Sequence, residues 1–581
     1  MSVIQETISA EIWDAKYRYR HAGKIIDSSI EDTWQRVAKA ISHVEKPKEK
    51  KFWQQEFYHL LEGFKFLPGG RILAGAGTTH KVTLFNCFVM DIKNDSLAGI
   101  FSALKEGALT LQQGGGIGYD FSGLRPRGEY GITSGIVASG PVSFMRIWNT
   151  TCGILLSTGA RRGAMMGVLR CDHPDIEEFI TAKNNPAELR HFNVSVLISD
   201  AFMKAVKNDD EWPLTFSIHN ISKIYKKVRA RKLWESIIQS AYDSAEPGVL
   251  FEDTINRMNN LWYRETISAT NPCGEIPLPA YGACNLGSLN LTQFVTQPFT
   301  SQAEVDWHGL ENSAKIATRF LDNVIDVSRY PLKAQKEQAQ GTRRIGLGFA
   351  GLADAFVMLG LQYGSDESMA LASKIMKTIS DVTWNTSSEL AIERGSFPFF
   401  EKENYLQGRF VKSLSADIQK NISTRGMRNS HHNTIAPTGT ISLLANNISS
   451  GLEPIFQGVY ERNVIQANNE IKKYLVTDYA LAEWRKINSS EKFPPAWVDS
   501  QKLTPQNHLQ IQQAVQPYID NAISKTINLP ADFPFEKLHD VYTQAHEMGL
   551  KGCTIYRPNP ITGSVLNVTE PEEIVEPCCQ M

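Results

Sequence analysis

The segment NPCGEIPLPAYGACNLGSLNL, residues 271–291, indicates both the fold and the chemistry of this chain. It carries two cysteines eleven positions apart (284 − 273), with Asn271 two residues before Cys273 and Glu275 two residues after it. Pro272 restricts the backbone just before the first thiol, so Cys273 lies on a stiff loop. Alternate side chains of an extended segment share one face, so we expect the amide, the thiol and the carboxylate to point the same way.

A carboxylate beside a thiol raises the pKa of that thiol. Cys273 is therefore poorly placed to act as a thiolate nucleophile. It is better placed as a neutral S–H group that loses a hydrogen atom. Glu275 would then take a proton from the same substrate, Asn271 would hold a hydroxyl, and Cys284 would deliver reducing equivalents. The segment predicts radical chemistry with an acid–base helper.

The composition excludes several classes of protein. The 581 residues allow about four average domains or one very large one, and 42% hydrophobic with 21% charged residues is ordinary for a globular protein. A formal net charge of −2 gives no reason to expect a nucleic-acid polymer as partner, although a small phosphorylated ligand needs only a local site. The first twenty residues carry acids and match no signal or transit peptide, and no run of 18 apolar residues occurs. We therefore expect a cytoplasmic protein that binds no membrane.

The eight cysteines are too few for a disulfide scaffold in a chain of this length. No C-x-x-C pair and no Cys/His spacing of a zinc site occurs, so the sequence predicts no metal bound by these residues. In a reducing compartment the default interpretation is that they are small buried hydrophobes, and for Cys152 and Cys171 we keep that interpretation.

Strands and helices alternate along most of the chain. Residues 1–66 are predicted to be helical, residues 67–557 to form the catalytic region, and residues 558–581 to form a flexible tail, because the composition turns to Pro, Asn, Glu and Thr. Within the catalytic region, helices are expected at 231–245, 308–329, 366–394 and 534–549, and a final strand at 553–556. The class is α/β, with ligands expected at the strand ends.

Three glycine-containing motifs leave alternatives open. GLGFAG, residues 346–351, fits a dinucleotide fingerprint but lacks the second strand that ends in an acid, and a tight strand-to-helix turn needs the same glycines. Thr438, Gly439 and Thr440 would hold a phosphate at a helix start or would simply cap a helix, and the spacing does not decide between them. Arg161 and Arg162, flanked by glycines, suit phosphate or base contacts, or form a solvated basic turn.

Taken together, NPCGE, YGACNLGSLNL, FNC, RRGAMMGVLRCDHPDIEEFI and APTGTIS resemble the ribonucleotide reductase family, and most closely its adenosylcobalamin-dependent class II type. The matching motifs spread from about residue 65 to residue 560. The resemblance implies a ten-stranded α/β barrel with Cys273 on a central finger loop. It also implies a ribonucleotide substrate, preferably a diphosphate, a deoxynucleotide effector, a thioredoxin-like reductant and a homodimer.

The resemblance assigns roles residue by residue. Cys273 would be the thiyl radical that takes the ribose 3′ hydrogen, Glu275 the base at the 3′-hydroxyl, and Asn271 the residue that orients the sugar. Cys87 and Cys284 would be the dithiol that reduces C2′, and Cys578 and Cys579 the tail thiols that re-reduce it. The implied substrate contacts are Asn86, Gly115, Gly116, Thr438, Gly439, Thr440 and Ile441, and the implied effector elements are Asn149 and the loop with Arg161 and Arg162.

Three positions depart from the family pattern. Asn149 stands where relatives usually have an acid that touches the effector, which weakens the expectation of effector binding. Gly69 stands where a small hydroxyl residue is common, so one phosphate contact is expected to be lost. Cys578 and Cys579 are adjacent where the tail thiols of relatives are spaced. The N-terminal segment is also too short for the ATP-binding regulatory domain of some relatives.

Several alternatives to a class II enzyme are open. A class I large subunit usually has a tyrosine dyad on its late strand, whereas this chain has Ile555 followed by a single tyrosine, Tyr556. A glycyl-radical enzyme would need a C-terminal glycine motif that this chain lacks. A catalytically inactive nucleotide-binding relative would not be expected to keep all five active-site residues together with the tail thiols. Without the resemblance, the residues alone suggest an α/β nucleotide-binding protein.

Overall fold

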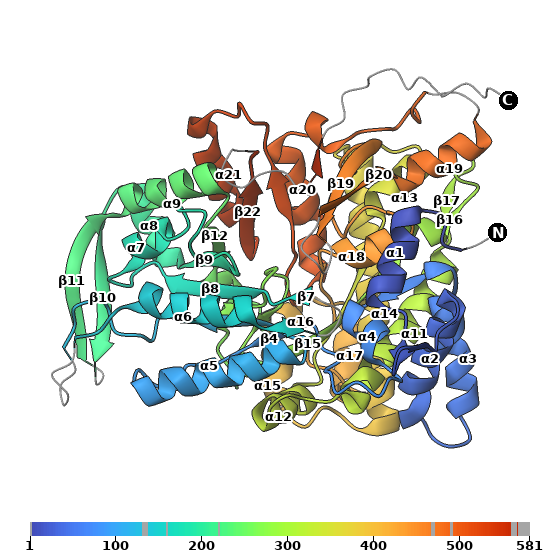
Figure 1. The fold of residues 1–581 in the computed structure, drawn as a ribbon, viewed down its shortest axis with the longest axis horizontal. Helices are drawn as coiled ribbons and strands as arrows, with labels where there is room; N and C mark the ends of the chain where they lie inside the picture. The colour runs from blue at the N-terminus through green and yellow to red at the C-terminus, as the bar shows by residue number, and fades with distance from the viewer. Residues whose placement is uncertain are drawn as a thin grey trace.

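The computed structural model describes residues 3–130, 137–157, 161–218, 221–465, 471–488, 492–558 and 566–567. Its centre is a ten-stranded sheet in the order β18-β15-β4-β5-β8-β9-β12-β22-β21, with β3 (Phe66–Pro68) paired beside β15. Helices surround this sheet on the outside (Figure 1). The predicted α/β class and ten-stranded architecture are confirmed.

The sheet consists of two parallel sets of strands. The first set is β4 (Cys87–Val89), β5 (Gly116–Asp120), β8 (Met165–Arg170), β9 (Phe192–Ile198) and β12 (Gly248–Phe251). The second set includes β15 (Ala283–Asn290), β18 (Ile345–Ala350), β21 (Thr526–Asn528) and β22 (Gly552–Tyr556). The two sets meet in antiparallel pairs at β4–β15 and at β12–β22. Most strand residues are buried, as expected when helices cover a parallel sheet.

The ends of the sheet come together through a short segment around Asn433. Leu347 of β18 bridges Asn433 in parallel, and Ile435 bridges Ile523, which lies just before β21. The sheet therefore closes into a barrel, and a closed barrel leaves no free sheet edge.

The finger loop runs through the interior of the barrel between two short strands, β13 (Ala269–Thr270) and β14 (Pro277–Leu278), which pair antiparallel. Two glycines of β5 make room for it. A Cβ at Gly118 would lie 1.8 Å from the carbonyl oxygen of Thr270, and one at Gly116 would lie 3.1 Å from Cγ of Pro272. Any larger residue at position 118 would displace the loop.

The helices outside the barrel match most of the expected ranges. They include α9 (Ala230–Ser244), α11 (Trp307–Val327), α14 (Asp366–Arg394) and α21 (Phe535–Glu547). The helices α5 (Leu97–Gln112) and α6 (Pro141–Ile154) lie side by side on one flank (Figure 1). Among the described residues, no helix combines the length and apolar character needed to cross a membrane.

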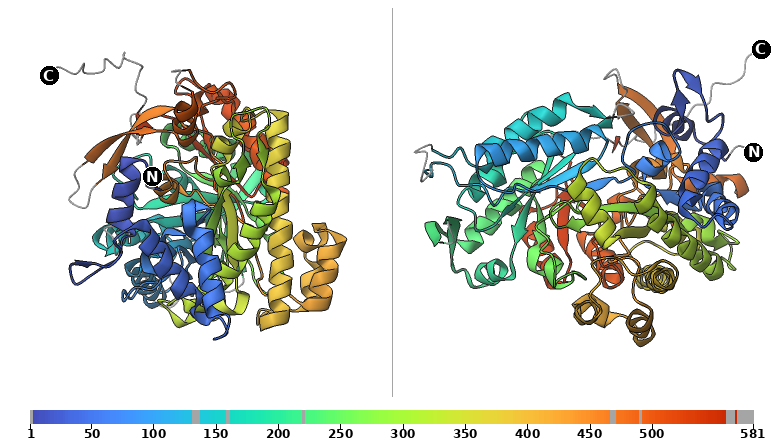
Figure 2. Two further views of the ribbon diagram at one scale, coloured as in Figure 1. Left: turned by 90° about the vertical axis from the view of Figure 1, so that its right-hand side faces the viewer. Right: turned by 90° about the horizontal axis from the view of Figure 1, so that it is seen from below.

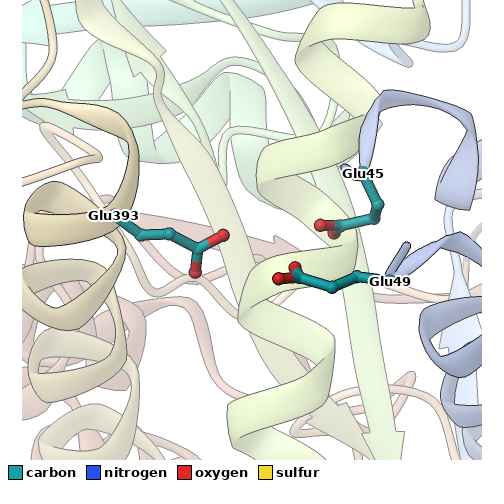
Figure 3. Close-up of side chains that lie close together, drawn as sticks. All are labelled: Glu45, Glu49 and Glu393. Atoms are coloured by element: carbon teal, nitrogen blue, oxygen red, sulfur yellow. The ribbon is translucent and has the colours of Figure 1, made fainter. Parts of the chain in front are cut away.

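The N-terminal helices α1 (Thr7–Lys16), α2 (Ile30–Ile41) and α3 (Lys50–Leu61) lie at the opposite side of the molecule (Figure 2), where α2 and α3 pack beside α11 and α1 packs against α18 (Gly439–Leu444). A buried network of ion pairs joins the N-terminal region to α11 and α14. Arg319 of α11 binds the carboxylates of Glu45 and Glu393 at 2.6 and 2.7 Å, and Arg394 also binds Glu45. Glu49 completes a group of three carboxylates whose oxygens lie within 4.8 Å of one another (Figure 3). Because two arginines bind Glu45 and Glu393, this network joins the helices to the barrel.

Some elements differ from the sequence-based expectations. A small hairpin, β1 (Arg20–His21) and β2 (Lys24–Ile25), interrupts the N-terminal helices. A longer hairpin, β10 (Glu211–Ile218) and β11 (Ile221–Arg229), projects from the barrel. The expected basic glycine loop contains paired strands, β6 (Leu156–Ser157) and β7 (Arg161–Arg162). Beyond the expected final strand, β23 (Leu566–Asn567) pairs with β19 (Val459–Ile465), which also pairs with β20 (Ile471–Thr477). The pairing of β19 with β23 is long-range and leaves little local pattern in the sequence.

Candidate active site

The finger loop makes a tight turn and is not extended as the sequence suggested. The backbone N–H of Gly274 donates to the carbonyl of Asn271 at 3.1 Å, and Gly274 has a φ of 80°. Glycine adopts this left-handed conformation without steric cost. The turn leaves Cys273 exposed at the tip, while Asn271 and Glu275 are buried on either side of it.

Asn271 connects the loop with the first cysteine. Its Oδ1 accepts from the N–H of Ile276 at 2.9 Å, which closes the base of the loop, and its Nδ2 donates to Sγ of Cys87 at 3.2 Å. The amide therefore fixes the finger loop against β4.

The Glu275 carboxyl group is buried, and burial raises its pKa to about 7, although a hydrogen bond from Asn271 opposes this rise. Its Oε2 has no hydrogen-bond partner among the described residues. An unpartnered buried acceptor is costly unless a ligand supplies a donor. A carboxyl group with a pKa near neutrality, open to a ligand hydroxyl, is suited to exchange a proton with that ligand.

Cys87 and Cys284 are cross-strand partners in the pairing of β4 with β15, and both are free thiols in this structure. Directly opposed residues of antiparallel strands have Cα atoms about 4.5 or 5.5 Å apart. Both values lie within the range of about 4.4–6.8 Å that a disulfide requires. Burial, together with the nearby Glu275, raises the pKa of Cys87 well above its usual range, and burial likewise raises that of Cys284. Both cysteines are therefore held as neutral thiols that can form a disulfide without backbone movement.

One cavity of about 200 Å³ collects nearly all of the predicted substrate-side residues. Cys284 lies one strand away from it, next to Cys87. The predicted residues that line the cavity are Asn86, Cys87, Gly115, Gly116, Asn271, Cys273, Glu275, Thr438, Gly439, Thr440 and Ile441.

The far side of this cavity is formed by the start of α18 (Gly439–Leu444). Thr438 has a left-handed backbone, and its hydroxyl lies 2.9 Å from that of Ser442 and accepts from the N–H of Gly451. A Cβ at Gly439 would meet no atom within 4 Å, so the approach to the helix start is open. The Thr438 side chain does not cap the helix N–H groups, so the capped-helix alternative fails here.

Comparisons with known proteins agree with this geometry. Residues 85–556 match the family model of the ribonucleotide reductase barrel domain, and residues 5–81 match that of the ribonucleotide reductase all-alpha domain. This chain belongs to the ribonucleotide reductase family.

Relatives of this reductase that share 37% sequence identity with it come from two species. The vitamin B12-dependent ribonucleoside-diphosphate reductase of Mycobacterium tuberculosis aligns over 95% of this chain and 76% of its own length. The protein of the same name from Thermoplasma acidophilum aligns over 90% of this chain and 68% of its own. The vitamin B12-dependent ribonucleotide reductase of Streptomyces coelicolor is 27% identical over 95% of this chain and 65% of its own length.

The reductase has a second cavity, of about 370 Å³, that also reaches Cys273. Cys273 and Pro272 line both cavities, so the thiol at the loop tip lies between them. Polar groups of the second cavity include Asn193, Lys551 and Gln516, and Oε1 of Gln516 is buried without a partner among the described residues. A cavity beside the exposed thiol, with an unused acceptor, fits a cofactor that must act on that thiol.

The predicted effector elements lie on α6 and the paired strands that follow it. Oδ1 of Asn149 accepts from the N–H of His191 at 2.9 Å. The side chains of Arg161 and Arg162 lie outside the described part of the structure. Gly163 and Ala164, directly after them, line the substrate-side cavity, so this segment connects α6 with that cavity.

Sequence reasoning missed several residues of the reductase cavity. Tyr17 reaches it from the N-terminal helices, and Gly70 and Arg71 reach it from the start of α4 (Gly70–Gly75). The signal that could have found Arg71 is an arginine in a glycine-rich segment, GGR at residues 69–71, which is also the feature that drew attention to Arg161 in GARRG. Gly69 also lines the cavity, and a Cβ there would lie 3.1 Å from Oδ1 of Asn86. A hydroxyl residue at this position would therefore press on Asn86. Cys578 and Cys579 lie outside the described residues.

Proposed function

We propose that this chain reduces ribonucleotides, preferably diphosphates, to 2′-deoxyribonucleotides, with a radical initiated by adenosylcobalamin. The observation that carries the proposal is the single cavity in which Cys273, Glu275, Asn271 and Cys87 meet the open start of α18. The names of the relatives, vitamin B12-dependent reductases, support both the reaction and the cofactor.

The cavity divides into a phosphate side and a ribose side. The free N–H groups at the start of α18 and the hydroxyl of Thr440 would hold the phosphates. The ribose would then lie over the finger loop, with Asn271 orienting its hydroxyls. Glu275, whose pKa is about 7, would take the proton of the 3′-hydroxyl while Cys273 removes the 3′ hydrogen atom as a thiyl radical.

Cys87 and Cys284 would supply the two electrons of the reduction. The C2′–O bond breaks and the oxygen leaves as water, a C2′–H bond forms, and the two thiols become a disulfide. The hydrogen atom that Cys273 removed returns to C3′. Per turnover, one ribonucleotide and one dithiol give one deoxyribonucleotide, one disulfide and one water. The disulfide would be reduced by Cys578 and Cys579, and these by a thioredoxin-like protein.

Adenosylcobalamin, when bound, supplies a carbon-centred radical through its weak cobalt–carbon bond. The residues that would hold it line the second cavity, including Gln516 and Asn193. Cys273 at the junction of the two cavities can be reached from both sides, which keeps the initiating group apart from the substrate.

The flank formed by α5 and α6 supports the proposal of a homodimer with an effector site. Large apolar side chains are exposed there, among them Phe101 at 49% and Ile154 at 76% of their full surface. Apolar surface of this kind commonly marks an interaction site. Asn149 lies on α6, so a deoxynucleotide bound at this flank would communicate with the cavity through Gly163 and Ala164.

The decisive experiment is an assay of the single purified chain with a ribonucleoside diphosphate and a small dithiol, with and without adenosylcobalamin. We expect deoxyribonucleotide only when the cofactor is present. Product that requires a metal-bearing partner subunit instead would assign the chain to the class I large subunits. Nucleotide binding without turnover under either condition would identify an inactive relative.

A further inference from the structure

Hydrogen bonds from the surrounding barrel hold the finger loop at both of its ends. Asn193 of β9 donates to the carbonyl of Pro272 at 2.7 Å. On the other side of the tip, the carbonyl of Glu275 accepts from the hydroxyl of Thr434 at 2.9 Å and from the N–H of Ala522 at 3.0 Å. Because these bonds fix the backbone of Glu275, they also fix where its carboxyl group enters the substrate-side cavity.

The position of Ala522 depends on the two residues before it. The Asp520 carboxylate accepts from the N–H groups of His432 and Asn433, each at 2.8 Å. Nζ of Lys551 donates to the carbonyl of Asp520 at 2.6 Å and also to the carbonyl of Asn521. Two consecutive carbonyls turned toward one ammonium group orient both peptide planes, and the next N–H, that of Ala522, points at Glu275.

Lys551 is an unusual residue for this task. It is 5% exposed, it lines the second cavity, and within the described residues no carboxylate pairs with its ammonium group. Burial lowers its pKa to about 8, and the nearby Arg344 contributes to the decrease, whereas the Asp520 carboxylate opposes it. A buried charge without a counterion costs stability, so an apolar residue would serve packing better at this position.

Lys525 offers a direct comparison, because it is also buried and lines the same cavity. Its ammonium group donates to the Glu453 carboxylate at 2.6 Å, to Nδ1 of His508 at 2.7 Å and to the carbonyl of Thr526 at 2.8 Å. All three donors of Lys525 are used away from residues 520–522, and one of them forms an ordinary ion pair. The ion pair with Glu453 therefore explains why a lysine can be buried at position 525, and Lys551 has no such ion pair among the described residues.

We propose that Lys551 is a positioning residue for Glu275: its ammonium group orients residues 520–522, which hold the Glu275 carbonyl and so aim the carboxyl group at the ribose. This inference rests on the proposed function, because it assumes that Glu275 acts on the substrate. According to this proposal, Lys551, which lines the second cavity, sets the position of Glu275 in the substrate-side cavity.

The test compares Lys551→Met with Lys551→Arg, Thr434→Val and Lys525→Met. In Lys551→Met we expect kcat to fall by about 10- to 100-fold, the effect of a small misplacement of a reacting group. We expect the KM for ribonucleotide and the affinity for adenosylcobalamin, followed by its visible spectrum, to stay within about threefold, because the ammonium group of Lys551 is directed at the carbonyls of Asp520 and Asn521. The acid limb of the kcat profile should move below its wild-type midpoint, because a looser Glu275 is better solvated. Lys551→Arg should recover most of the activity.

Amide hydrogen exchange gives a readout that does not require turnover. Residues 271–278 should exchange faster in Lys551→Met and in Thr434→Val, which removes a second hold on the same carbonyl. Lys525→Met removes the ion-pair partner of Glu453 and should lower the unfolding temperature, but should leave the exchange of residues 271–278 at the wild-type rate. If Lys551→Met does not fold, Thr434→Val tests the same hold on Glu275.

Wild-type exchange of residues 271–278 in a folded Lys551→Met would overturn the proposal, whatever Thr434→Val shows. So would a loss of kcat matched by an equal loss of cofactor affinity, because Lys551 would then be a binding residue. A wild-type chain that reduces no ribonucleotide would instead refute the proposed function, and the exchange experiment would still decide whether Lys551 holds the loop.

Discussion

Cys87 and Cys284 stand directly opposite each other where the two parallel halves of the barrel meet in antiparallel register. Strand pairing, and not a loop, therefore brings these two cysteines together from distant parts of the sequence. Because the strands on both sides are buried, neither cysteine can move far, and strand pairing holds their Cα atoms at a spacing that a disulfide allows.

We predict that incubation of the fully reduced protein with substrate and cofactor, without a reductant, converts this pair to a disulfide in a single turnover. Mass spectrometry after alkylation should show a Cys87–Cys284 peptide pair in an amount equal to the deoxyribonucleotide formed. Cys284→Ser should yield no deoxyribonucleotide. Cys171→Ala, which changes a buried thiol outside both cavities, is the control and should keep its activity. A full yield of product from Cys284→Ser would exclude the dithiol assignment.

Glu275 should govern the pH dependence of the reaction. Its pKa of about 7 means that the carboxylate, the form that accepts a proton, becomes populated only as the pH rises through neutrality. We expect kcat to rise through pH 7 and Glu275→Gln to lose about 10²- to 10⁴-fold in kcat, the usual range for general-base catalysis. The thiols of Cys87 and Cys284 also lie near this carboxyl, and they are neutral at the start of the reaction because burial raises the pKa of each. A kcat that stays flat between about pH 5.5 and about pH 8 would contradict the assignment, because this range brackets the expected pKa of Glu275.

The carboxyl group of Glu275 should also make the free energy of unfolding depend on pH. Its folded-state pKa of about 7 lies above the ordinary value of 4.5, so the folded protein holds a proton that the unfolded chain releases. The stability linked to this group is therefore fully present below pH 4.5 and is lost as the pH rises through 7. We expect Glu275→Gln to raise the free energy of unfolding at pH 8 by up to about 3 kcal/mol and to leave it unchanged near pH 4.5. Urea unfolding at the two pH values measures the difference, and an equal effect at both would contradict it.

The sequence allowed the α/β class, the long helices and the grouping of Asn271, Cys273 and Glu275 to be predicted. These features depend on local patterns: the spacing of apolar residues within helices, and three functional side chains within five positions. The resemblance to a family then supplied the expected contacts of Asn86 and Thr438, which are far apart in the sequence and line one cavity in the structure.

Features that depend on long-range contacts could not be predicted from the residues. The turn at Gly274 replaces the expected extended loop, because the loop must fit between β5 and the Asn433 segment inside a closed barrel. Tyr17 reaches the cavity from helices that were assigned to a separate region. Lys551 gives no signal in the sequence at all, since its importance lies in two carbonyls thirty residues away.

Asn149 gives a prediction about regulation. Its Oδ1 accepts from the N–H of His191, and an aspartate can accept the same bond. Asn149→Asp should therefore keep the local structure and add the negative charge that the family resemblance leads us to expect at this position, and a charged acceptor strengthens a hydrogen bond from an effector hydroxyl. We expect effector binding, measured by calorimetry with deoxynucleoside triphosphates, to tighten or to stay unchanged. Asn149→Ala loses the bond to His191 and should bind more weakly. A large loss of affinity in Asn149→Asp would mean that the effector lies elsewhere.

Cys578 and Cys579 should act as a shuttle between the buried pair and an external reductant. Adjacent Cα atoms lie about 3.8 Å apart, which is short of the range for an ordinary disulfide. A bond between the two would be strained and easily reduced, so we expect it to form only transiently, or one thiol to attack and the other to resolve. Changing both to serine should spare turnover driven by a small dithiol and abolish turnover driven by thioredoxin. An equal loss with both reductants would show that these thiols are not a shuttle.

The last prediction concerns the origin of the radical. Cys273 and Pro272 both line the two cavities, and of these two residues only Cys273 carries an S–H group. We therefore expect hydrogen-atom transfer from one cavity to the other to pass through its sulfur. The chain carries neither a tyrosine dyad on β22, where Tyr556 follows Ile555, nor a cysteine cluster for iron and sulfur. We therefore predict that the lone chain is active with adenosylcobalamin, dithiol and ribonucleotide. Cys273→Ser should fold, bind adenosylcobalamin with unchanged affinity as judged by its visible spectrum, and form no product, because a serine O–H bond is too strong to yield its hydrogen atom. Substantial activity of Cys273→Ser would refute the assignment of this sulfur. Activity that needs no cobalamin, but only a metal-loaded partner subunit, would change the source of the radical and leave Cys273, Asn271 and Glu275 in the same roles.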